Sequence, residues 1–285
     1  MRFVRNLKTT LEMIKFEHTV FALPFALLST ILASGGWPER AKLLWIVVAM
    51  VGARSAAMAF NRIADRQIDG ENPRTQARPL PAGQLSLTFT VLFTFGAALV
   101  FVLAASQLNR LCLWLSVPVL SILLFYSYTK RFTNYSHLVL GFCLGMAPLG
   151  AWIAVRGSVR LTPVLLCLIV MLWTAGFDII YACQDLEFDR YRNLFSVPKR
   201  YGVRTALRVS WALHVVMLLL LVALFFAENL GWISLVGIAL VTGLLWYEHS
   251  LVHPDDLSKV NVAFFTVNGY ISILLLLAVG LDKLS

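Results

Sequence analysis

Long apolar runs fill most of the chain, and short polar segments separate them. A helix needs about 20 apolar residues to cross the roughly 30 Å hydrocarbon layer of a bilayer. Each run here is too long for a strand and has the length of a helix. We count nine such runs, at 16–36, 41–62, 87–107, 111–128, 136–155, 163–184, 206–227, 231–250 and 262–281. The pattern predicts an all-α polytopic membrane protein with nine transmembrane helices in the lipid bilayer.

The composition agrees with this class, and the charge indicates a topology. Hydrophobic residues make up 59% of the chain and charged residues 14%, against about 25% charged in soluble domains. The net charge of +9 would suit a nucleic-acid partner. However, most Lys and Arg residues lie in 1–15, 62–86, 129–135 and 185–205, which the predicted helices place on one side of the membrane. The positive-inside rule therefore predicts a cytoplasmic N-terminus, and we expect no nucleic-acid partner.

A charged stretch, NRIADRQIDGENPRTQARPLPAG, begins at Asn61 where the second apolar run ends. Asn61, Asp65 and Asp69 are four residues apart, so they share one face of a helix. We expect this helix to end at Gly70, before an Asn-Pro pair. Arg54 falls on the same face, inside the span. Since an arginine there costs about 2.5–3.5 kcal/mol, it should face a cavity or a partner.

A second acidic stretch, GFDIIYACQDLEFDRYR, ends the sixth apolar run. Asp178, Asp185 and Asp189 are spaced by seven and four residues, again on one helix face. A single D-x-x-x-D at a helix end is more often a solvated surface. Two such ends on the same predicted side of the membrane favour a shared site instead.

The two acidic stretches also suggest how the chain is organised. Each follows the second helix of a group of four, as a weak internal duplication would produce. We therefore predict a single domain over 1–285, with possible four-helix repeats at 16–135 and 136–261 and a ninth helix after them.

The residue types at these two stretches favour one kind of chemistry. Carboxylates that lie close together beside an apolar, low-dielectric region repel one another, and bound cations offset this repulsion. Mg²⁺ commonly takes one or two carboxylates and completes its shell with phosphate oxygens and water. Basic residues that suit anion recognition lie near each cluster, namely Arg62, Arg66, Arg74, Arg78, Arg190, Arg192, Lys199 and Arg200. The combination indicates a metal–diphosphate site for a ligand with an apolar tail.

These motifs resemble a known family. N-x-x-x-D-x-x-x-D, then N-P-R-T-x-x-R-P-L-P-x-G, and later Y-x-x-x-D-x-x-x-D are similar to the UbiA superfamily of intramembrane prenyltransferases. The resemblance covers nearly the whole chain and includes EHTVFALPFA at Glu17–Ala26, YSYTKR at Tyr126–Arg131 and NVAFFTVNGYIS near the end. KFEHTVFALPFA looks most like 4-hydroxybenzoate polyprenyltransferase-like members. The resemblance implies nine helices around a central cavity and Mg²⁺-dependent transfer of a polyprenyl group from its diphosphate to an aromatic ring.

Roles follow from this resemblance for the residues that match its motifs. The implied metal ligands, which would hold two Mg²⁺ on the diphosphate, are Asn61, Asp65, Asp69, Asp185 and Asp189. The implied partners of the leaving diphosphate are Arg74, Arg78 and Lys130. Arg54 and Asp178 match deeper polar positions, where the aromatic acceptor is thought to bind.

The chemistry of the implied reaction adds further candidates. The prenyl carbon becomes cationic as its C–O bond breaks, and the aromatic faces of Tyr126, Tyr128 or Phe177 would stabilise it by cation–π contact. A base must then take the ring proton, and Asp178 is the candidate. We expect polyprenyl diphosphate and an aromatic acid as substrates, and the sequence indicates no protein partner.

Two alternatives stay open. Within the enzyme class, the acceptor is 4-hydroxybenzoate, for ubiquinone, or a dihydroxynaphthoate, for menaquinone. From another class, intramembrane charges and internal repeats are typical of transporters, although the acids here cluster at one face. Lack of a transit-peptide pattern predicts a prokaryotic inner (plasma) membrane, with the active site on its cytoplasmic side.

Overall fold

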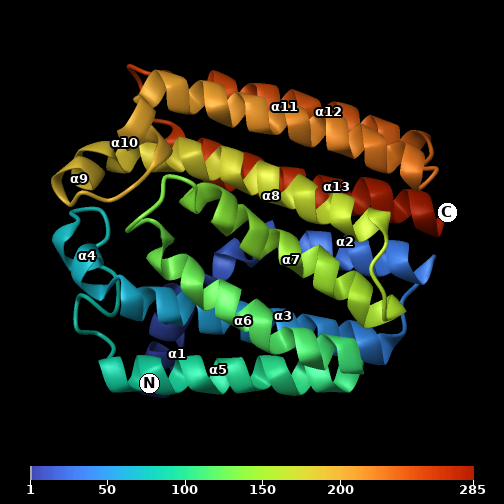
Figure 1. The fold of residues 1–285 in the computed structure, drawn as a ribbon, viewed down its shortest axis with the longest axis horizontal. Helices are drawn as coiled ribbons and strands as arrows, with labels where there is room; N and C mark the ends of the chain where they lie inside the picture. Colours follow the sequence, from blue (N-terminus) through green and yellow to red (C-terminus); the bar gives the residue numbers. More distant parts are fainter. Residues whose placement is uncertain (1) are drawn as a thin grey trace. The chain divides into compact units, whose positions relative to one another are not determined.

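The computed structural model describes residues 2–285, with side chains described except at 2–7 and 16–18. The chain forms two compact units. Unit 1 comprises Met1–Thr19 and Leu44–Tyr128, and unit 2 comprises Val20–Leu43 and Thr129–Ser285. Every regular element in the described part of the chain is helical, which confirms the predicted all-α class (Figure 1).

Unit 1 is built from long helices and one short one. Its elements are α1 (Arg2–Met13), α3 (Arg40–Ala64, whose first residues belong to unit 2), α4 (Arg66–Glu71), α5 (Leu87–Leu108) and α6 (Arg110–Thr129). The side chain of Ser86 accepts a hydrogen bond from the amide of Phe89 and so caps α5. Helices α3 and α5 pack closely at Gly52, where a Cβ would lie 2.8 Å from the amide nitrogen of Phe101.

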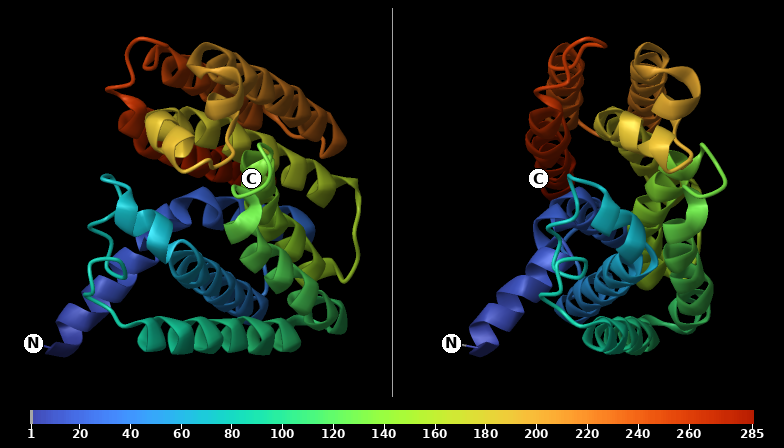
Figure 2. Two further views of the ribbon diagram at one scale, coloured as in Figure 1. Left: turned by 60° about the vertical axis from the view of Figure 1, so that its left-hand side comes forward. Right: turned by 90° about the vertical axis from the view of Figure 1, so that its left-hand side faces the viewer.

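Unit 2 holds the larger apolar core. Its elements are α2 (Leu23–Ser34), α7 (Ser136–Arg156), α8 (Leu161–Ala182), η2 (Cys183–Asp185), α9 (Leu186–Tyr191), α10 (Val197–Tyr201), α11 (Val203–Ala227), α12 (Trp232–Ser250), the π-helix η3 (Val262–Val267) and α13 (Asn268–Leu284). The 3₁₀-helix η1 (Phe16–Phe21) crosses from one unit to the other. Helix α8 lies between α7 and α11, and α12 pairs with α13 (Figures 1 and 2).

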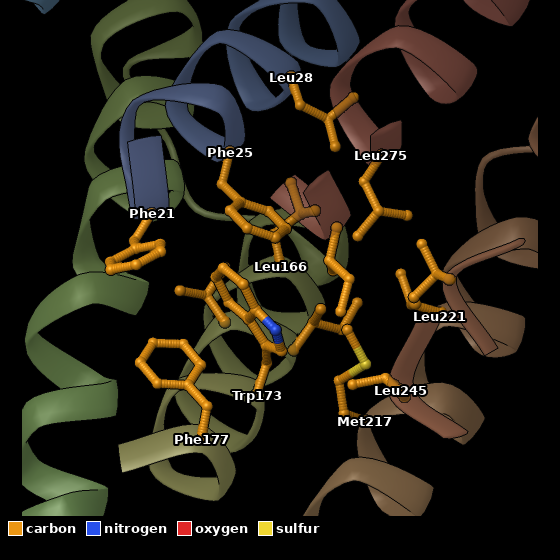
Figure 3. Packing of buried hydrophobic residues seen from close by; sticks show 14 of the residues in the cluster. Phe21, Phe25, Leu28, Leu166, Trp173, Phe177, Met217, Leu221, Leu245 and Leu275 are labelled. Atoms are coloured by element: carbon orange, nitrogen blue, oxygen red, sulfur yellow. The ribbon is translucent and has the colours of Figure 1, made fainter. Parts of the chain in front are cut away.

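Aromatic rings fill the centre of unit 2 around α8 (Figure 3). The centroid of the Trp173 ring lies 5.1 Å from that of the Phe25 ring and 5.0 Å from that of the Phe177 ring. Phe21 contacts Phe177 at 5.4 Å between ring centroids. Tilted and edge-to-face pairs of this kind add to the stability that burial provides. This packing buries the segment of α8 that leads to Asp178.

A buried polar network ties four helices together behind these rings. The indole Nε1 of Trp173 donates to Asn268 Oδ1 at 2.6 Å, and Asn268 Nδ2 donates to Glu248 Oε1 at 2.7 Å. His214 Nε2 lies 3.1 Å from the carbonyl oxygen of Trp173, and its Nδ1 lies 2.9 Å from His249 Nε2. Buried polar groups are costly unless paired, so the network specifies how α8, α11, α12 and α13 fit together.

The predicted spans agree with the structure except at the first one. Eight helices in the described part of the chain are long and apolar enough to cross a membrane, which supports a multi-pass membrane protein. The predicted run at 16–36 instead divides into η1 and the 12-residue α2, with Pro24 beside the start of α2. Since proline lacks the amide hydrogen that the preceding turn would use, α2 begins there. The count of nine, the cytoplasmic N-terminus and the two repeats stay predictions.

Candidate active site

The first acidic motif lies on one helical face of unit 1. Helix α3 ends at Ala64 and α4 begins at Arg66, but the helical hydrogen bonds continue through Asp65. The amide of Asp65 donates to the Asn61 carbonyl at 2.9 Å, and that of Asp69 donates to the Asp65 carbonyl at 2.7 Å. The three polar side chains therefore share a face, as their spacing predicts, and Asn61 Nδ2 donates to Asp65 Oδ2 at 3.1 Å.

Two guanidinium groups balance the charge of this motif. Asp65 and Asp69 are only 2% and 4% exposed. Arg78 Nη1 lies 2.8 Å from both carboxylate oxygens of Asp69. Arg62 Nη1 lies 3.6 Å from Asp69 Oδ2 and 3.3 Å from Asn61 Oδ1, and its Nε donates to the Met13 carbonyl. A buried carboxylate is costly without an opposite charge nearby, and these two arginines supply that charge beside Asp69.

The loop after α4 explains how Arg78 reaches Asp69. Asn72 Oδ1 accepts from the amide of Arg74 at 2.9 Å, and Thr75 Oγ1 donates to the Asp69 carbonyl at 3.0 Å. This turn brings the chain back toward α4, so that Arg78 faces the acidic side of the helix. Arg74, predicted to bind the same anion, is exposed.

Arg54 lies in an apolar span, where its charge needs a polar partner, and a backbone carbonyl group supplies one. It is partly buried in α3, and its Nη2 donates to the carbonyl oxygen of Lys15 at 2.9 Å. Lys15 follows α1 and has a positive φ of 49°. In the same unit, Tyr126 is partly buried on α6, and the Tyr128 ring contacts that of Phe60 edge-on at 5.9 Å. The Tyr128 ring therefore packs against α3 within the same unit.

The second acidic motif, in unit 2, repeats the local geometry of the first. Asp185 precedes the six-residue helix α9 with φ −95° and ψ 6°, and Asp65 precedes the six-residue α4 with φ −95° and ψ 7°. Asp189 is 9% exposed, and its Oδ2 accepts from Ser196 Oγ at 2.7 Å. The Lys130 carbonyl accepts from the amide of Phe195 at 2.7 Å. The loop between α9 and α10 is thereby bonded to both the motif and the backbone at Lys130, within unit 2.

Asp178 has a partner that the sequence did not reveal. His137, at the start of α7, places its Nδ1 2.7 Å from Asp178 Oδ2. The side chain of His137 is 6% exposed and that of Asp178 is 20% exposed. On the other side of the ring, Nε2 lies 3.4 Å from the amide nitrogen of Val197. A polar residue at the start of an apolar run was the only sequence sign of this role.

The ligand atoms in each unit fit a hard divalent cation that a substrate helps to bind. Both motifs present carboxylate oxygens, and the first adds the amide of Asn61, which are the donors that Mg²⁺ prefers. Among the side chains that the structure describes, no group of three or more His, Cys, Asp or Glu residues could hold a metal ion. One or two carboxylates with diphosphate oxygens and water would suffice. The prediction that both motifs bind one diphosphate stays a prediction.

Comparison with known proteins identifies relatives over most of the chain. A sequence model of the UbiA prenyltransferase family matches residues 22–270. A 4-hydroxybenzoate octaprenyltransferase of Tolumonas auensis is 32% identical over 237 residues, covering 83% of this chain and 82% of the relative. One of Nitrosospira multiformis is 31% identical and covers 89% and 87%.

Solved structures share the fold. The apo structure of a UbiA homolog from Aeropyrum pernix K1 is 34% identical, with a TM-score of 0.85 over 94% of this chain and 98% of that one. A UbiA homolog from Archaeoglobus fulgidus bound to GPP and Mg²⁺ has a TM-score of 0.74 at 19% identity, over 96% and 99% of the two chains. The second likeness is one of fold alone.

Proposed function

Because the chain belongs to the UbiA prenyltransferase family and is an aromatic prenyltransferase, we propose that it transfers a polyprenyl group from polyprenyl diphosphate to the ring of 4-hydroxybenzoate, for ubiquinone biosynthesis. The observation that carries the proposal is the buried pair Asp65 and Asp69, held on one helix face with Arg62 and Arg78 beside them. Relatives called 4-hydroxybenzoate octaprenyltransferase support the choice of acceptor.

The acidic motifs would bind the diphosphate end of the substrate. The residues that would hold two Mg²⁺ are Asn61, Asp65, Asp69, Asp185 and Asp189. The bound ions would offset the negative charge that develops on the diphosphate as the allylic C–O bond breaks. Arg74, Arg78 and Lys130 would bind diphosphate oxygens. Because Arg78 contacts both carboxylate oxygens of Asp69, the diphosphate would compete with Asp69 for this guanidinium group.

The deeper residues would bind and deprotonate the acceptor. Arg54 would bind the carboxylate of 4-hydroxybenzoate, and Tyr126 would face the cationic prenyl carbon. The ring carbon ortho to the phenol forms the new C–C bond while the diphosphate leaves with the electrons of the C–O bond. The ring proton then passes to the Asp178 carboxylate, which restores the aromatic ring. Apolar surroundings would keep water from the cation.

The reaction would take place at the cytoplasmic side of a prokaryotic inner membrane. Both acidic motifs come at the C-terminal ends of apolar helices, α3 with α4 and α8 with α9. In the predicted topology those ends lie on the side that carries most of the Lys and Arg residues. A polyprenyl diphosphate would enter there with its headgroup in water and its tail in lipid.

A membrane assay with geranyl diphosphate and Mg²⁺ tests the proposal. Membranes that contain the protein are supplied with labelled 4-hydroxybenzoate or labelled dihydroxynaphthoate, with and without EDTA. We expect prenylated benzoate only where Mg²⁺ is available. Product from the naphthoate alone would assign the protein to menaquinone biosynthesis. Substrate-dependent ion flux in liposomes without diphosphate release would indicate a transporter and overturn the proposal.

A further inference from the structure

The orientation of Asp178 depends on a histidine from another helix. Asp178 lies on α8, four residues before its end, whereas His137 is the second residue of α7. The 2.7 Å bond between His137 Nδ1 and Asp178 Oδ2 joins the two helices. A histidine and a carboxylate in contact usually suggest that the histidine is the base and the carboxylate its support. Here the contact of the second ring nitrogen, Nε2, indicates that the carboxylate is the base and the histidine its support.

The second ring nitrogen of His137 identifies the tautomer. The amide of Val197 can only donate a hydrogen bond, and Nε2 of His137 lies 3.4 Å from it. Nε2 must therefore carry a lone pair, and the ring proton is on Nδ1. His137 consequently donates to Asp178 and has no nitrogen left for a substrate. The carboxylate keeps Oδ1, the oxygen that His137 does not engage.

We infer that His137 is a positioning residue, which holds the Asp178 carboxylate so that Oδ1 faces the aromatic acceptor. The inference deepens the proposed function and rests on it for the identity of the acceptor. Gly176 and Ser210 support the same arrangement from the other side of α8, because Ser210 Oγ donates to the Gly176 carbonyl at 2.8 Å. Asp178 is thus held in place by both its side chain and the backbone just before it.

The same histidine joins this carboxylate to the loop after the second acidic motif. Val197, which donates to His137, is the first residue of α10. Ser196, directly before it, donates to Asp189 and accepts from the amide of Lys199. One short segment therefore contacts a predicted metal ligand and, through His137, the predicted acceptor base. Loss of the imidazole should affect the acceptor more than the diphosphate, because Ser196 and Asp189 keep their own bond.

A pair of substitutions separates positioning from simple packing. In His137→Gln, the amide can donate from its nitrogen to Asp178 and accept at its oxygen from the amide of Val197, whereas His137→Leu can do neither. We expect His137→Gln to keep at least a third of the wild-type kcat/KM for the acceptor. His137→Leu should lose about 10- to 100-fold, since a hydrogen bond to a charged group is lost. His253→Gln, the same change at an exposed histidine, is the control and should match wild type.

The loss should fall on one substrate. In His137→Leu, we expect KM for 4-hydroxybenzoate to rise, kcat to fall, and KM for geranyl diphosphate to stay within twofold of wild type. Equal losses in His137→Gln and His137→Leu, with both proteins folded in detergent, would overturn the inference. Wild-type kinetics in His137→Leu would overturn it as well.

A spectroscopic readout tests the inference without turnover. The chain has five histidines, so the signal missing from ¹⁵N-histidine-labelled His137→Gln assigns the ring nitrogens of His137. We expect a neutral ring with the proton on Nδ1. A proton on Nε2, or on both nitrogens, would contradict the inference even if the enzyme is active. If wild-type protein prenylates neither aromatic acid, the proposed function fails, and this spectrum still decides the orientation of His137.

Discussion

Arg78 Nη1 lies 2.8 Å from both carboxylate oxygens of Asp69, nine residues earlier in the chain. Arg78 belongs to the loop that follows α4, and Asp69 belongs to the acidic face of α4. The pair is 24% and 5% exposed at its side chains, so water screens it only in part. A residue predicted to bind the substrate anion is thus paired with a residue predicted to bind the metal, and the substrate would have to compete for both.

Substitution of Arg78 should therefore weaken substrate binding. In Arg78→Gln, we expect kcat/KM for the prenyl diphosphate to fall about 10- to 100-fold, because a charge-assisted contact to the diphosphate is lost. Arg78→Lys should recover part of the loss, since it keeps the charge but lacks the planar fork of donors. Steady-state kinetics at saturating acceptor measure the effect. Arg110→Gln, at an exposed position at the start of α6, serves as the control, and an equal loss there would contradict a specific role for Arg78.

The acidic residues at the start of α4 and α9 should be essential for turnover. We expect Asp65→Ala and Asp185→Ala each to lower the rate at least about 100-fold, on the order of the loss of one electrostatic contact to the reacting group. Size-exclusion elution in detergent should match wild type, because both substitutions lie at helix ends. Glu187→Ala, which removes an exposed carboxylate of α9, is the matched control. Near-normal product formation by either aspartate variant would refute the assignment of that motif.

The polar network in unit 2 should contribute to stability. In Asn268→Ala, Trp173 Nε1 and Glu248 Oε1 both lose their partner. Each buried group left unsatisfied costs about 1–3 kcal/mol, so we expect a loss of about 2–6 kcal/mol for the two groups. The midpoint of thermal unfolding in detergent measures it.

Two further variants control this result. Glu248→Gln keeps an oxygen that can accept from Asn268, so it should cost less than Asn268→Ala. Thr242→Ala removes an exposed hydroxyl that bonds only within its own helix, and it should be nearly neutral. If Asn268→Ala unfolds at the same temperature as wild type, the network is not a stabilising element.

Gly176 should not tolerate a side chain. A Cβ at this position would lie 2.2 Å from Nε2 of His214. Because the His214 ring is fully buried and bonded to the Trp173 carbonyl, it has little room to move. We expect Gly176→Ala to lower the free energy of unfolding by about 1–3 kcal/mol.

A second glycine provides the matched control. A Cβ at Gly150 in α7 would meet nothing within 4 Å. Gly150→Ala should therefore be neutral or slightly stabilising, because alanine favours a helix by about 1 kcal/mol over glycine. Equal melting temperatures for the two alanine variants would show that the His214 ring yields to the added methyl group.

Local periodicity was enough to predict the acidic faces, and contacts between helices were not predictable in the same way. The spacing of Asn61, Asp65 and Asp69 fixes their common face as soon as the segment is helical. The His137–Asp178 pair spans 41 residues and depends on how α7 packs against α8. That packing relies on Gly141, where a Cβ would lie 2.1 Å from the Met171 carbonyl oxygen. A single sequence does not reveal such a close approach.

The first apolar run shows that hydropathy does not predict the type of helix that a segment forms. Hydropathy gave 16–36 the length of a span, but a 3₁₀-helix occupies its beginning and α2 has 12 residues. Apolar composition reports burial or lipid contact and does not report the type of helix. The basic residues near the first motif were evident from the sequence, but their ion pairs were not. The pairing of Arg78 with Asp69 depends on the turn at Asn72 and Thr75.

The most direct test of the account is the amount of prenylated 4-hydroxybenzoate formed by membranes that contain the protein, with geranyl diphosphate, before and after removal of Mg²⁺. The account predicts product in Mg²⁺, none in EDTA, recovery when Mg²⁺ is restored, and none from Asp65→Ala membranes under any condition. Product that persists in EDTA, or that Asp65→Ala forms as fast as wild type, would contradict the central claim that the acidic motifs bind the metal and the diphosphate.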